Sequence, residues 1–407
     1  MRVIVVNSGS SSIKYEIFEL NGLVAAANGL LERIGEQDSK LRHRRLNPSG
    51  TWEEIVETRH VADHREGASL ILQVSSSERA NSTEAEIFAV GHRVVHGGEK
   101  FSEPAIINDA VLSDIEALIP LAPLHNPANV IGIKVMRDLL PHVPQVAVFD
   151  TAFHQTMPPK AFHYALPNDF YQSLGVRRYG FHGSSHRFVT KEAARHLGVP
   201  AKRLNLITFH LGNGASAAAI AQGKSIDTSM GLTPLEGLVM GTRCGDLDPA
   251  VHFYLARKTG RPFEEIENIL NKQSGLKGIC GVNDMREIQN RAKSGDAQAE
   301  LALEVFCYRV KKYIGAYYAA LGSVDAIVFT GGIGENSAFV RAKSCEGLAG
   351  LGITLDEYRN NAVRGGITEI QKKSGKVKIL VIPTNEEYEI ARQTVEVVER
   401  SKGEDDD

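Results

Sequence analysis

The sequence predicts a duplicated α/β fold of two domains. Three apolar strands, at residues 2–7, 205–211 and 325–330, each end in a turn of small residues. Glycine lets backbone N–H groups approach an anion closely, and serine hydroxyls and asparagine amides add further donors. Such turns, far apart in the chain, indicate two phosphate-binding loops and a nucleoside-binding loop from two similar halves. This layout is typical of an enzyme that transfers a phosphoryl group from a nucleotide bound in a cleft between its domains.

Composition limits the function further. The 407 residues suffice for two domains, and hydrophobic and charged fractions of 43% and 23% are those of a soluble protein. A net charge of −3 gives no indication of nucleic acid or an anionic membrane surface as a partner. We see no signal peptide and no apolar run long enough to span a bilayer, and the cysteines form no C-x-x-C pair. We therefore expect a cytoplasmic protein without a structural zinc site.

Hydrophobic patterning places the elements of the first domain, which is predicted to span residues 1–150. Residues 36–60 are polar and weakly patterned, and we interpret them, with the basic run Arg42-His43-Arg44-Arg45, as a solvated surface excursion. Strands are predicted at 2–7, 13–20, 87–96 and 145–150, and helices at 108–119 and 127–140.

The second domain, predicted to span 151–385, repeats the order of strand, turn and hairpin. Its strands are predicted at 205–211, 215–220, 325–330 and 377–382, and its helices at 247–258, 263–273 and 296–321. Thr384 and Asn385 precede two glutamates, which is a helix N-cap signal. We expect the helix that follows, 386–400, to complete the first domain, and residues 401–407 to form a disordered acidic tail.

A series of short blocks resembles the acetate kinase family, in the family's order and over almost the whole chain. The blocks are NSGSSSIK at 7–14, GHRVVHGG at 91–98, FDTAFH at 149–154, YGFHGSSH at 179–186, HLGNG at 210–214, DTSMGLTPLEG at 227–237, GTR at 241–243, GGIGEN at 331–336 and TNEE at 384–387. That family belongs to the superfamily of sugar kinases, heat-shock ATPases and actin. The resemblance therefore implies an actin-like fold with an interdomain nucleotide cleft.

The resemblance also implies an activity. It is the reversible, Mg²⁺-dependent transfer of the γ-phosphoryl group of ATP to acetate, giving acetyl phosphate and ADP, by a homodimer. One alternative is a kinase of propionate or another short-chain acid. The other is a non-catalytic actin-like nucleotide-binding protein. The sequence argues against it, because it contains all of Arg93, Asp150, Arg243 and Glu386.

Four side chains are predicted to act on the reacting groups. A carboxylate acceptor is already ionised at neutral pH, so the reaction needs positive charge rather than a general base. Arg93 and Arg243 fit this need, because guanidinium groups match carboxylate and phosphoryl oxygens. Asp150 ends a buried strand, where it either caps a loop or, as the resemblance implies, lies near the metal and the acceptor. The resemblance makes His182 a donor to the transferring phosphoryl group.

The resemblance extends to metal, nucleotide and acetate. It implies that Asn7 and Glu386 bind Mg²⁺, with Mn²⁺ as an alternative; for Glu386 the other interpretation is a helix-capping role. The implied ATP-binding residues are Lys14, Ser10, Ser12, His210, Asn213, Gly214, Asp284, Arg286, Gly332, Ile333, Gly334 and Asn336, although Asp284 and Arg286 also fit a helix N-terminus with a charge pair. The implied acetate-binding residues are Arg93, Val95, Leu124, His125, Phe181 and Pro234.

Two further motif matches are rejected. Residues 212–217 fit the dinucleotide pattern G-x-G-x-x-A, but a hairpin strand follows instead of the required helix. His182 and His186 have the spacing of a metal-binding pair on a helix, yet the glutamate of H-E-x-x-H is missing. No P-loop motif occurs in the sequence.

Overall fold

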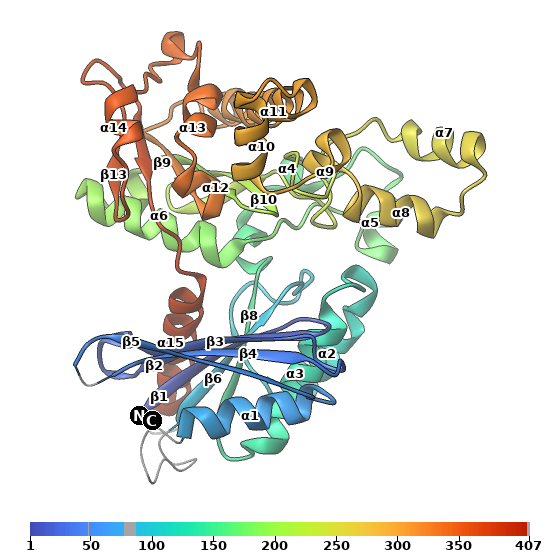
Figure 1. The fold of residues 1–407 in the computed structure, drawn as a ribbon, viewed down its shortest axis with the longest axis vertical. Coiled ribbons are helices and arrows are strands. Elements are labelled where there is room, and N and C mark those ends of the chain that lie inside the picture. Colours follow the sequence, from blue (N-terminus) through green and yellow to red (C-terminus); the bar gives the residue numbers. More distant parts are fainter. Residues whose placement is uncertain (48, 77–86, 405–407) are drawn as a thin grey trace. The chain divides into compact units, whose positions relative to one another are not determined.

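The computed structural model describes residues 1–47, 49–76 and 87–404, which form two compact units (Figure 1). Unit 1 comprises Met1–Ala152 together with the chain from Asn385 onward, and unit 2 comprises Phe153–Thr384. In the described part of the chain, no helix is both long and apolar enough to cross a membrane.

Unit 1 contains a mixed sheet with the strand order β5-β4-β3-β2-β1-β6-β8-β7. Strands β1, β6 and β8 are parallel, and the others pair antiparallel to their neighbours. The strands are β1 (Arg2–Ser8), β2 (Ser12–Glu19), β3 (Val24–Glu32), β4 (Ser39–Leu46), β5 (Trp52–Arg59), β6 (Ile87–Val94), β7 (Ala105–Ile106) and β8 (Gln145–Phe149). The helices are α1 (His64–Ser76), α2 (Asp109–Ala117), α3 (Asn126–Leu139) and α15 (Glu386–Glu404).

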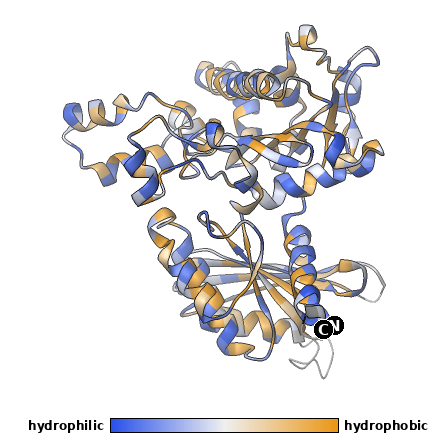
Figure 2. Cartoon of the chain, turned by 180° about the vertical axis from the view of Figure 1, so that it is seen from behind, coloured by the Kyte–Doolittle hydropathy of each residue, from blue (hydrophilic) through white to orange (hydrophobic). Residues whose placement is uncertain are grey.

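Helices cover both faces of this sheet, as the unbroken apolar run of β1 requires. Side chains alternate along a strand, so Ile4 and Val6 enter one hydrophobic cluster, with residues of α1 and α3. Val3 and Val5 enter a second cluster, which includes Ile390 of α15. Figure 2 shows helices alternating between hydrophilic and hydrophobic stretches, as amphipathic helices do when one side is buried.

Unit 2 repeats the plan of unit 1. Its strand order, β11-β10-β9-β12-β14-β13, corresponds position by position to β3-β2-β1-β6-β8-β7, which establishes the duplication. Its strands are β9 (Asn205–Leu211), β10 (Ala215–Ala221), β11 (Lys224–Thr228), β12 (Ala326–Thr330), β13 (Thr368–Glu369) and β14 (Lys378–Val381). Its helices are α4 (Pro159–Phe162), α5 (Asn168–Leu174), α6 (Gly183–Leu197), α7 (Ala250–Thr259), α8 (Phe263–Lys272), α9 (Gly275–Cys280), α10 (Met285–Lys293), α11 (Ala297–Leu321), α12 (Gly331–Asn336), α13 (Ala338–Cys345) and α14 (Glu357–Asn361).

The interpretation of residues 36–60 as a solvated excursion is wrong. Most of the segment forms the antiparallel pair β4–β5, which extends the sheet of unit 1. Along β4, Leu41 and His43 are buried while Arg42 and Arg44 are exposed, as the alternation of a strand dictates. His43 Nδ1 lies 2.6 Å from the hydroxyl of Tyr15, so only part of the basic run is solvated.

The predicted tail also starts too early. Helix α15 continues through residues 401–404, where the hydroxyl of Ser401 donates to the carbonyl of Val398. The ammonium of Lys402 lies 4.7 Å from the ring centre of Phe88, which ties the last turn to the sheet. The rest of the predicted tail, residues 405–407, lies outside the described residues.

Two buried histidines lead to a prediction about acid stability. His92 in unit 1 and His154 in unit 2 are fully enclosed, and burial lowers the pKa of each from 6.5 to about 4. The unfolded chain takes up these protons below pH 6.5 and the folded chain does not until about pH 4, so stability falls as the pH drops through this window. We expect each histidine to contribute a loss of about 2 kcal/mol between pH 7.5 and pH 5.

Urea unfolding at both pH values, followed by signals from each unit, measures this loss. His154→Gln should reduce the pH dependence of unit 2, where the buried His186 also has a lowered pKa, and leave that of unit 1 unchanged. Equal unfolding midpoints at pH 7.5 and pH 5 in the unaltered protein would contradict the prediction.

Candidate active site

Arg93 and Asp150 form a bidentate ion pair in unit 1. Strands β6 and β8 run parallel, and Arg93 lies beside Val148 just before β8 ends at Phe149. The guanidinium donates from Nε to Oδ1 of Asp150 at 3.1 Å and from Nη2 to Oδ2 at 2.5 Å. The Asp150 side chain is only 1% exposed, against 22% for Arg93. The carboxylate thus fixes the orientation of a guanidinium whose edge remains accessible.

Other ionisable groups of unit 1 act on this pair. Burial raises the pKa of Asp150, and interactions with Arg93 and, to a smaller extent, His125 oppose that rise. Burial lowers the pKa of Arg93, but the charges of Asp150 and Glu386 outweigh it, so the pKa of Arg93 is raised. Five predicted site residues of unit 1 are therefore connected by electrostatic interactions: Arg93, Asp150, His125, Glu386 and Lys14.

Glu386 does not cap its helix. The cap of α15 is Asn385, whose Oδ1 accepts a hydrogen bond from the Tyr388 N–H at 2.9 Å. Glu386 has no hydrogen-bond or ion-pair partner among the described residues, and burial, reinforced by Glu387, raises its pKa against the opposing charge of Arg93. Glu387 instead pairs with Lys14 of β2, which lies opposite Asn7 of β1.

The predicted metal ligands, Asn7 and Glu386, have side chains that suit a magnesium ion. Asn7 and Glu386 offer oxygen atoms without a hydrogen-bond partner in the described part of the protein, and oxygen ligands suit Mg²⁺. The residues that the structure describes contain no group of three or more His, Cys, Asp or Glu side chains that could hold a metal ion. The donor set therefore fits a magnesium ion that keeps several waters rather than one enclosed by protein ligands.

The serine-rich turn follows β1 directly. Its backbone is closed by a hydrogen bond from the Gly9 N–H to the carbonyl of Ser12 at 2.8 Å, and His64 Nε2 lies 2.7 Å from the carbonyl of Gly9. Ser10 is exposed and Ser12 is half-buried. The Ser10 side chain is thus available to a ligand at the end of the strand.

Two glycine-rich segments of unit 2 lie side by side at one edge of its sheet. Strands β9 and β12 are parallel, with His210 beside Thr330, so the turn after β9 and the helix α12 after β12 begin at the same edge. Gly331 has φ +76°, and a Cβ there would lie 2.8 Å from the carbonyl oxygen of Leu211. Only glycine permits this approach. Crevices at the carboxyl ends of parallel strands are common ligand sites in α/β folds.

His182 and Arg243 converge on the first of these segments. A Cβ on Gly214 would lie 3.5 Å from both Nε2 of His182 and Nη1 of Arg243, so both groups face the space that the glycine leaves free. His182 has φ +57°, which is uncommon for a residue other than glycine, and it caps the N-terminus of α6. Arg243 also donates from Nη1 to the carbonyl of Pro234 at 3.2 Å.

His210 and Asn213 adjoin the same turn. The His210 ring centre lies 4.3 Å from that of His182, and its Nδ1 is 2.8 Å from the hydroxyl of Ser185. The carbonyl of Asn213 accepts from the Gly241 N–H at 2.9 Å, which ties the turn to the loop that carries Arg243. The structure therefore brings together His182, His210, Asn213, Gly214 and Arg243.

The residues predicted to bind the nucleoside form only local interactions within or beside their own helices. Asp284 caps α10 and forms an exposed ion pair with Arg286 at 2.6 Å, so both carry the structural role that the sequence also allowed. Hydrogen bonding by Arg286 lowers the pKa of Asp284. In the helix α12, which replaces the expected turn, Asn336 donates to the carbonyl of Gly332 at 2.9 Å. Ile333 is half-buried and Gly334 is buried.

The predicted acetate-binding residues belong to both units. In unit 1, Val95 is 6% exposed and Leu124 is 56% exposed. In unit 2, Phe181 is 2% exposed, and its carbonyl faces His154 Nε2 at 3.0 Å, while Pro234 is half-buried.

Comparison with known proteins identifies the family. Residues 2–392 match the model of the acetokinase family. The chain belongs to the acetokinase family. It is 63% identical over 402 residues to acetate kinase of Syntrophobacter fumaroxidans, covering 98% of both chains. The structure is similar to those of Porphyromonas gingivalis acetate kinase (TM-score 0.92, 45% identity, 98% and 99% of the two chains) and a Francisella tularensis propionate kinase (TM-score 0.90, 43% identity, 97% and 99%). The predicted actin-like two-domain fold is confirmed.

In this acetokinase family member, a set of buried polar residues that no sequence motif predicted lies behind the predicted site residues. The ring of His186 is hydrogen-bonded to both Thr208 and Ser216, and all three residues are 0% exposed. The available signal is the spacing of His182 and His186 on one helix, which resembles a metal-binding motif. Both ring nitrogens of His186 lie within hydrogen-bond distance of hydroxyl groups, those of Thr208 and Ser216.

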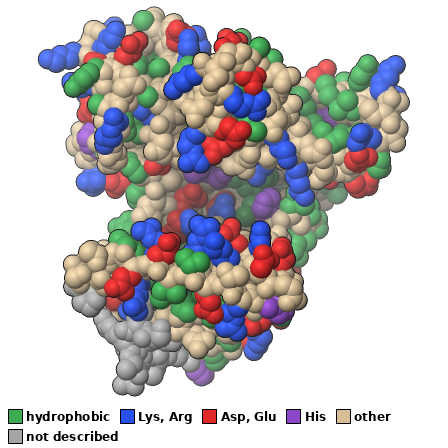
Figure 3. All heavy atoms as spheres, in the orientation of Figure 1, with side chains coloured by type: hydrophobic (Ala, Val, Ile, Leu, Met, Phe, Trp, Pro, Cys, Tyr) green, Lys and Arg blue, Asp and Glu red, His purple; other side chains and the backbone are tan. Residues whose placement is uncertain are grey.

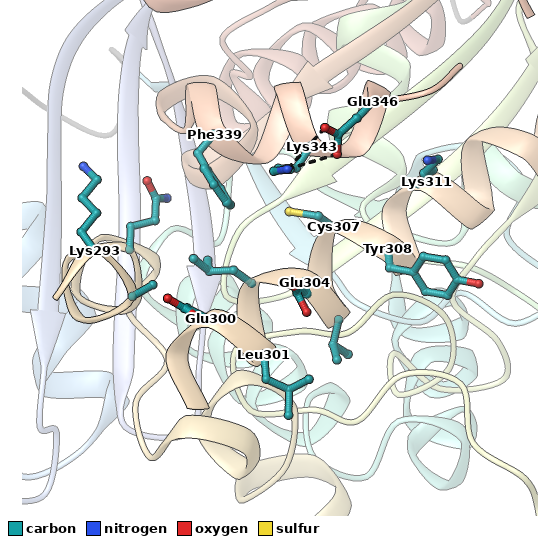
Figure 4. A pocket seen from close by; sticks show the side chains of 14 residues that line it. Lys293, Glu300, Leu301, Glu304, Cys307, Tyr308, Lys311, Phe339, Lys343 and Glu346 are labelled. Carbon is teal, nitrogen blue, oxygen red and sulfur yellow. Dashed lines mark hydrogen bonds and ion pairs between the residues drawn. The ribbon is translucent and has the colours of Figure 1, made fainter. Parts of the chain in front are cut away.

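A separate hollow of about 670 Å³ lies on α11 between α10 and α13 (Figure 4). None of its lining residues is a predicted site residue of this acetokinase family member. Lys343 and Glu346, which the figure joins by dashed lines, form an ion pair at 3.1 Å. The charged lining residues balance in sign: Lys293, Lys311, Lys343, Glu300, Glu304 and Glu346. The lining therefore carries no net formal charge.

Proposed function

We propose that this protein is an ATP-dependent kinase that transfers the γ-phosphoryl group reversibly to acetate, giving acetyl phosphate and ADP. The observation that carries the proposal is the convergence of His182 and Arg243 on Gly214, at the strand ends of unit 2. A hydrogen-bond donor and a guanidinium that face a glycine turn suit the oxygens of a phosphoryl group. The relatives named above as acetate kinases support acetate as the acceptor.

In the proposed reaction each residue acts through position and charge. Arg93, held by Asp150, binds the acetate carboxylate, which needs no general base because it is already ionised. A carboxylate oxygen attacks the γ-phosphorus, and the bond to the β,γ-bridging oxygen breaks, leaving its electron pair on ADP. Arg243 and His182 stabilise the charge on the moving phosphoryl group. Asn7 and Glu386 would hold Mg²⁺, or Mn²⁺, whose positive charge would offset that of the phosphate oxygens.

We propose further properties that follow from the same identity. A homodimer is supported by aromatic side chains of α7 and α8 that are more than half exposed, namely Phe253, Tyr254 and Phe263. A cytoplasmic location is supported by four free thiols. Neither nucleic acid nor a membrane is expected as a partner, since the net charge is −3 and both signs of charge are interspersed on the face in Figure 3. Sedimentation should give the mass of two chains.

Formation of acetyl hydroxamate tests the activity directly. The purified protein with ATP, acetate and Mg²⁺ should produce acetyl phosphate, which hydroxylamine traps. Removal of metal with a chelator should abolish the product, and Mg²⁺ should restore it. Nucleotide binding without any product would instead support the non-catalytic alternative.

A second candidate, propionate kinase, is favoured by the Francisella tularensis structure and leads to a prediction about chain length. We expect acetate to be preferred because Val95, with two methyl groups more than alanine, crowds a longer acid. One methylene is worth about 1–3 kcal/mol, so the preference should not exceed about two-hundredfold. Val95→Ala should shift the ratio of kcat/KM values toward propionate.

The neighbouring Val94 provides a matched control. Val94 is 0% exposed and packs in the hydrophobic cluster of Phe101 and Phe149, so Val94→Ala should lower stability without changing the acid preference. A wild-type preference for propionate, or an unchanged ratio in Val95→Ala, would show that Val95 does not set chain length.

A further inference from the structure

A buried chain of hydrogen bonds runs behind His182 in unit 2. His182 Nδ1 lies 2.9 Å from the hydroxyl of Ser216 on β10. The same hydroxyl lies 2.8 Å from Nε2 of His186 on α6, and His186 Nδ1 lies 2.7 Å from the hydroxyl of Thr208 on β9. Thr208, His186 and Ser216 are each 0% exposed, so solvent does not compete for these hydrogen bonds.

Thr208 is at the end of this hydrogen-bonded series farthest from His182, and it determines which atom donates in each hydrogen bond. The Thr208 hydroxyl has no other hydrogen-bond partner within the described residues, so its proton is donated to Nδ1 of His186. Burial holds the pKa of His186 well below 6.5, so its imidazole is neutral. With Nδ1 accepting, His186 carries its single proton on Nε2 and donates to Ser216. The Ser216 hydroxyl then donates to Nδ1 of His182.

The opposite direction is unfavourable. It would place a proton on Nδ1 of His182, make Ser216 donate to His186, and make His186 donate to Thr208. The hydroxyl proton of Thr208 would then be buried without an acceptor among the described residues. An unmade hydrogen bond of a buried donor costs more than an unused lone pair on an oxygen. The first direction is therefore the one that the packing selects.

We propose that Thr208, His186 and Ser216 are positioning residues that hold His182 neutral, with its proton on Nε2. That nitrogen is the one that faces the Gly214 turn beside Arg243. The charged or titratable groups around His182 are Arg243, His210 of β9 and His186, and a positive charge on the first two would further disfavour protonation of His182.

This inference deepens the proposed function, and rests on it only for the identity of the ligand as a phosphoryl oxygen. A neutral imidazole with Nε2–H donates a hydrogen bond to that oxygen without giving up its proton. His182 then stabilises the transferring group in a fixed orientation, and no proton transfer accompanies the step.

Nitrogen NMR of the histidine rings tests the proposal on the full-length, unliganded protein. The chain contains 14 histidines, so the His182 signals are assigned by their loss in His182→Gln. We expect a bare Nδ1, a protonated Nε2 and a titration midpoint below the ordinary value of about 6.5. In Ser216→Ala the donor to Nδ1 is lost, so forms protonated at Nδ1 should appear and the midpoint should rise by about one pH unit or more.

Two further variants separate this role from a general structural one. Thr190→Ala removes another buried hydroxyl of α6, which donates to the backbone carbonyl of His186 and not to a ring nitrogen, and should leave the His182 signals unchanged. His186→Gln keeps an amide that can donate to Ser216 and accept from Thr208, so it should retain the Nε2–H form, whereas His186→Leu should not.

A wild-type His182 protonated on Nδ1, or Ser216→Ala spectra identical to wild type, would overturn the inference. The NMR measurement needs neither substrate nor turnover, so it is independent of the activity assay. If the protein gave the expected spectra but formed no acetyl phosphate, the proposed function would be wrong and the inference about His182 would stand.

Discussion

Arg243→Ala is expected to lower kcat by at least about two orders of magnitude, with a smaller change in KM for ATP. Nη1 of Arg243 lies beside the Gly214 turn together with Nε2 of His182. The charge on a phosphoryl group in transfer spreads over its oxygens, so a guanidinium at this point stabilises the transition state more than bound ATP. Steady-state hydroxamate or coupled assays measure the effect.

Two comparisons make the Arg243 experiment specific. Arg243→Lys keeps a positive charge but not the planar fork, so it should recover only part of the lost kcat. Arg359→Ala removes an exposed arginine on α14 of the same unit and should leave kcat unchanged. A folded Arg243→Ala protein with kcat within about threefold of wild type would refute the role.

The strand ends could be predicted because their signals are local. A run such as Val3–Val6 is apolar on both faces, so it indicates a strand buried between two layers, and the small residues after it mark the edge where ligands bind. The same signals indicated the ends of β9 and β12, and the parallel pairing of these strands brings Gly214 and Gly332 to one edge of the second sheet.

The hairpin β4–β5 could not be predicted in this way. Nearly all of β5 is exposed, and on the face of the buried Leu41 and His43 it places Ile55 between Glu53 and Glu57, so the alternation that reveals a strand is weak. What forms it is pairing along β4, from Ser39 opposite Arg59 to Leu46 opposite Trp52. Backbone pairing of this kind leaves little mark on hydrophobic patterning.

Residues that position other side chains, such as Thr208 and Ser216, could not be predicted from the sequence either. Thr208 and Ser216 are ordinary strand residues until the β9–β10 pairing and helix α6 bring both to His186. The loop with Arg243 is held in a comparable way. The side chain of Asp246 accepts from the Gly237 N–H at 2.8 Å and from the Tyr313 hydroxyl at 3.0 Å, across a long stretch of sequence. Spacing within a motif carries no information about such partners.

Arg93→Ala is the second change with a large expected effect, and it should act on both activity and stability. Loss of the acceptor-binding guanidinium should lower kcat by about two orders of magnitude and raise KM for acetate about tenfold. It also leaves the carboxylate of Asp150, 1% exposed, without its ion-pair partner. Removing one member of a buried pair typically costs about 3–5 kcal/mol, because the other charge remains buried.

The double variant Arg93→Ala with Asp150→Asn separates these two effects. A neutral amide removes the uncompensated charge, so the free energy of unfolding should return toward that of wild type while turnover stays low. In Arg93→Ala alone, burial raises the pKa of Asp150 without the opposing guanidinium, so its folded pKa lies further above its unfolded value. The folded state then binds more protons, and the stability loss should be largest above the folded pKa and shrink as the pH falls through it. If the double variant regained turnover with its stability, Arg93 would be a structural partner of Asp150 and not the acetate-binding group.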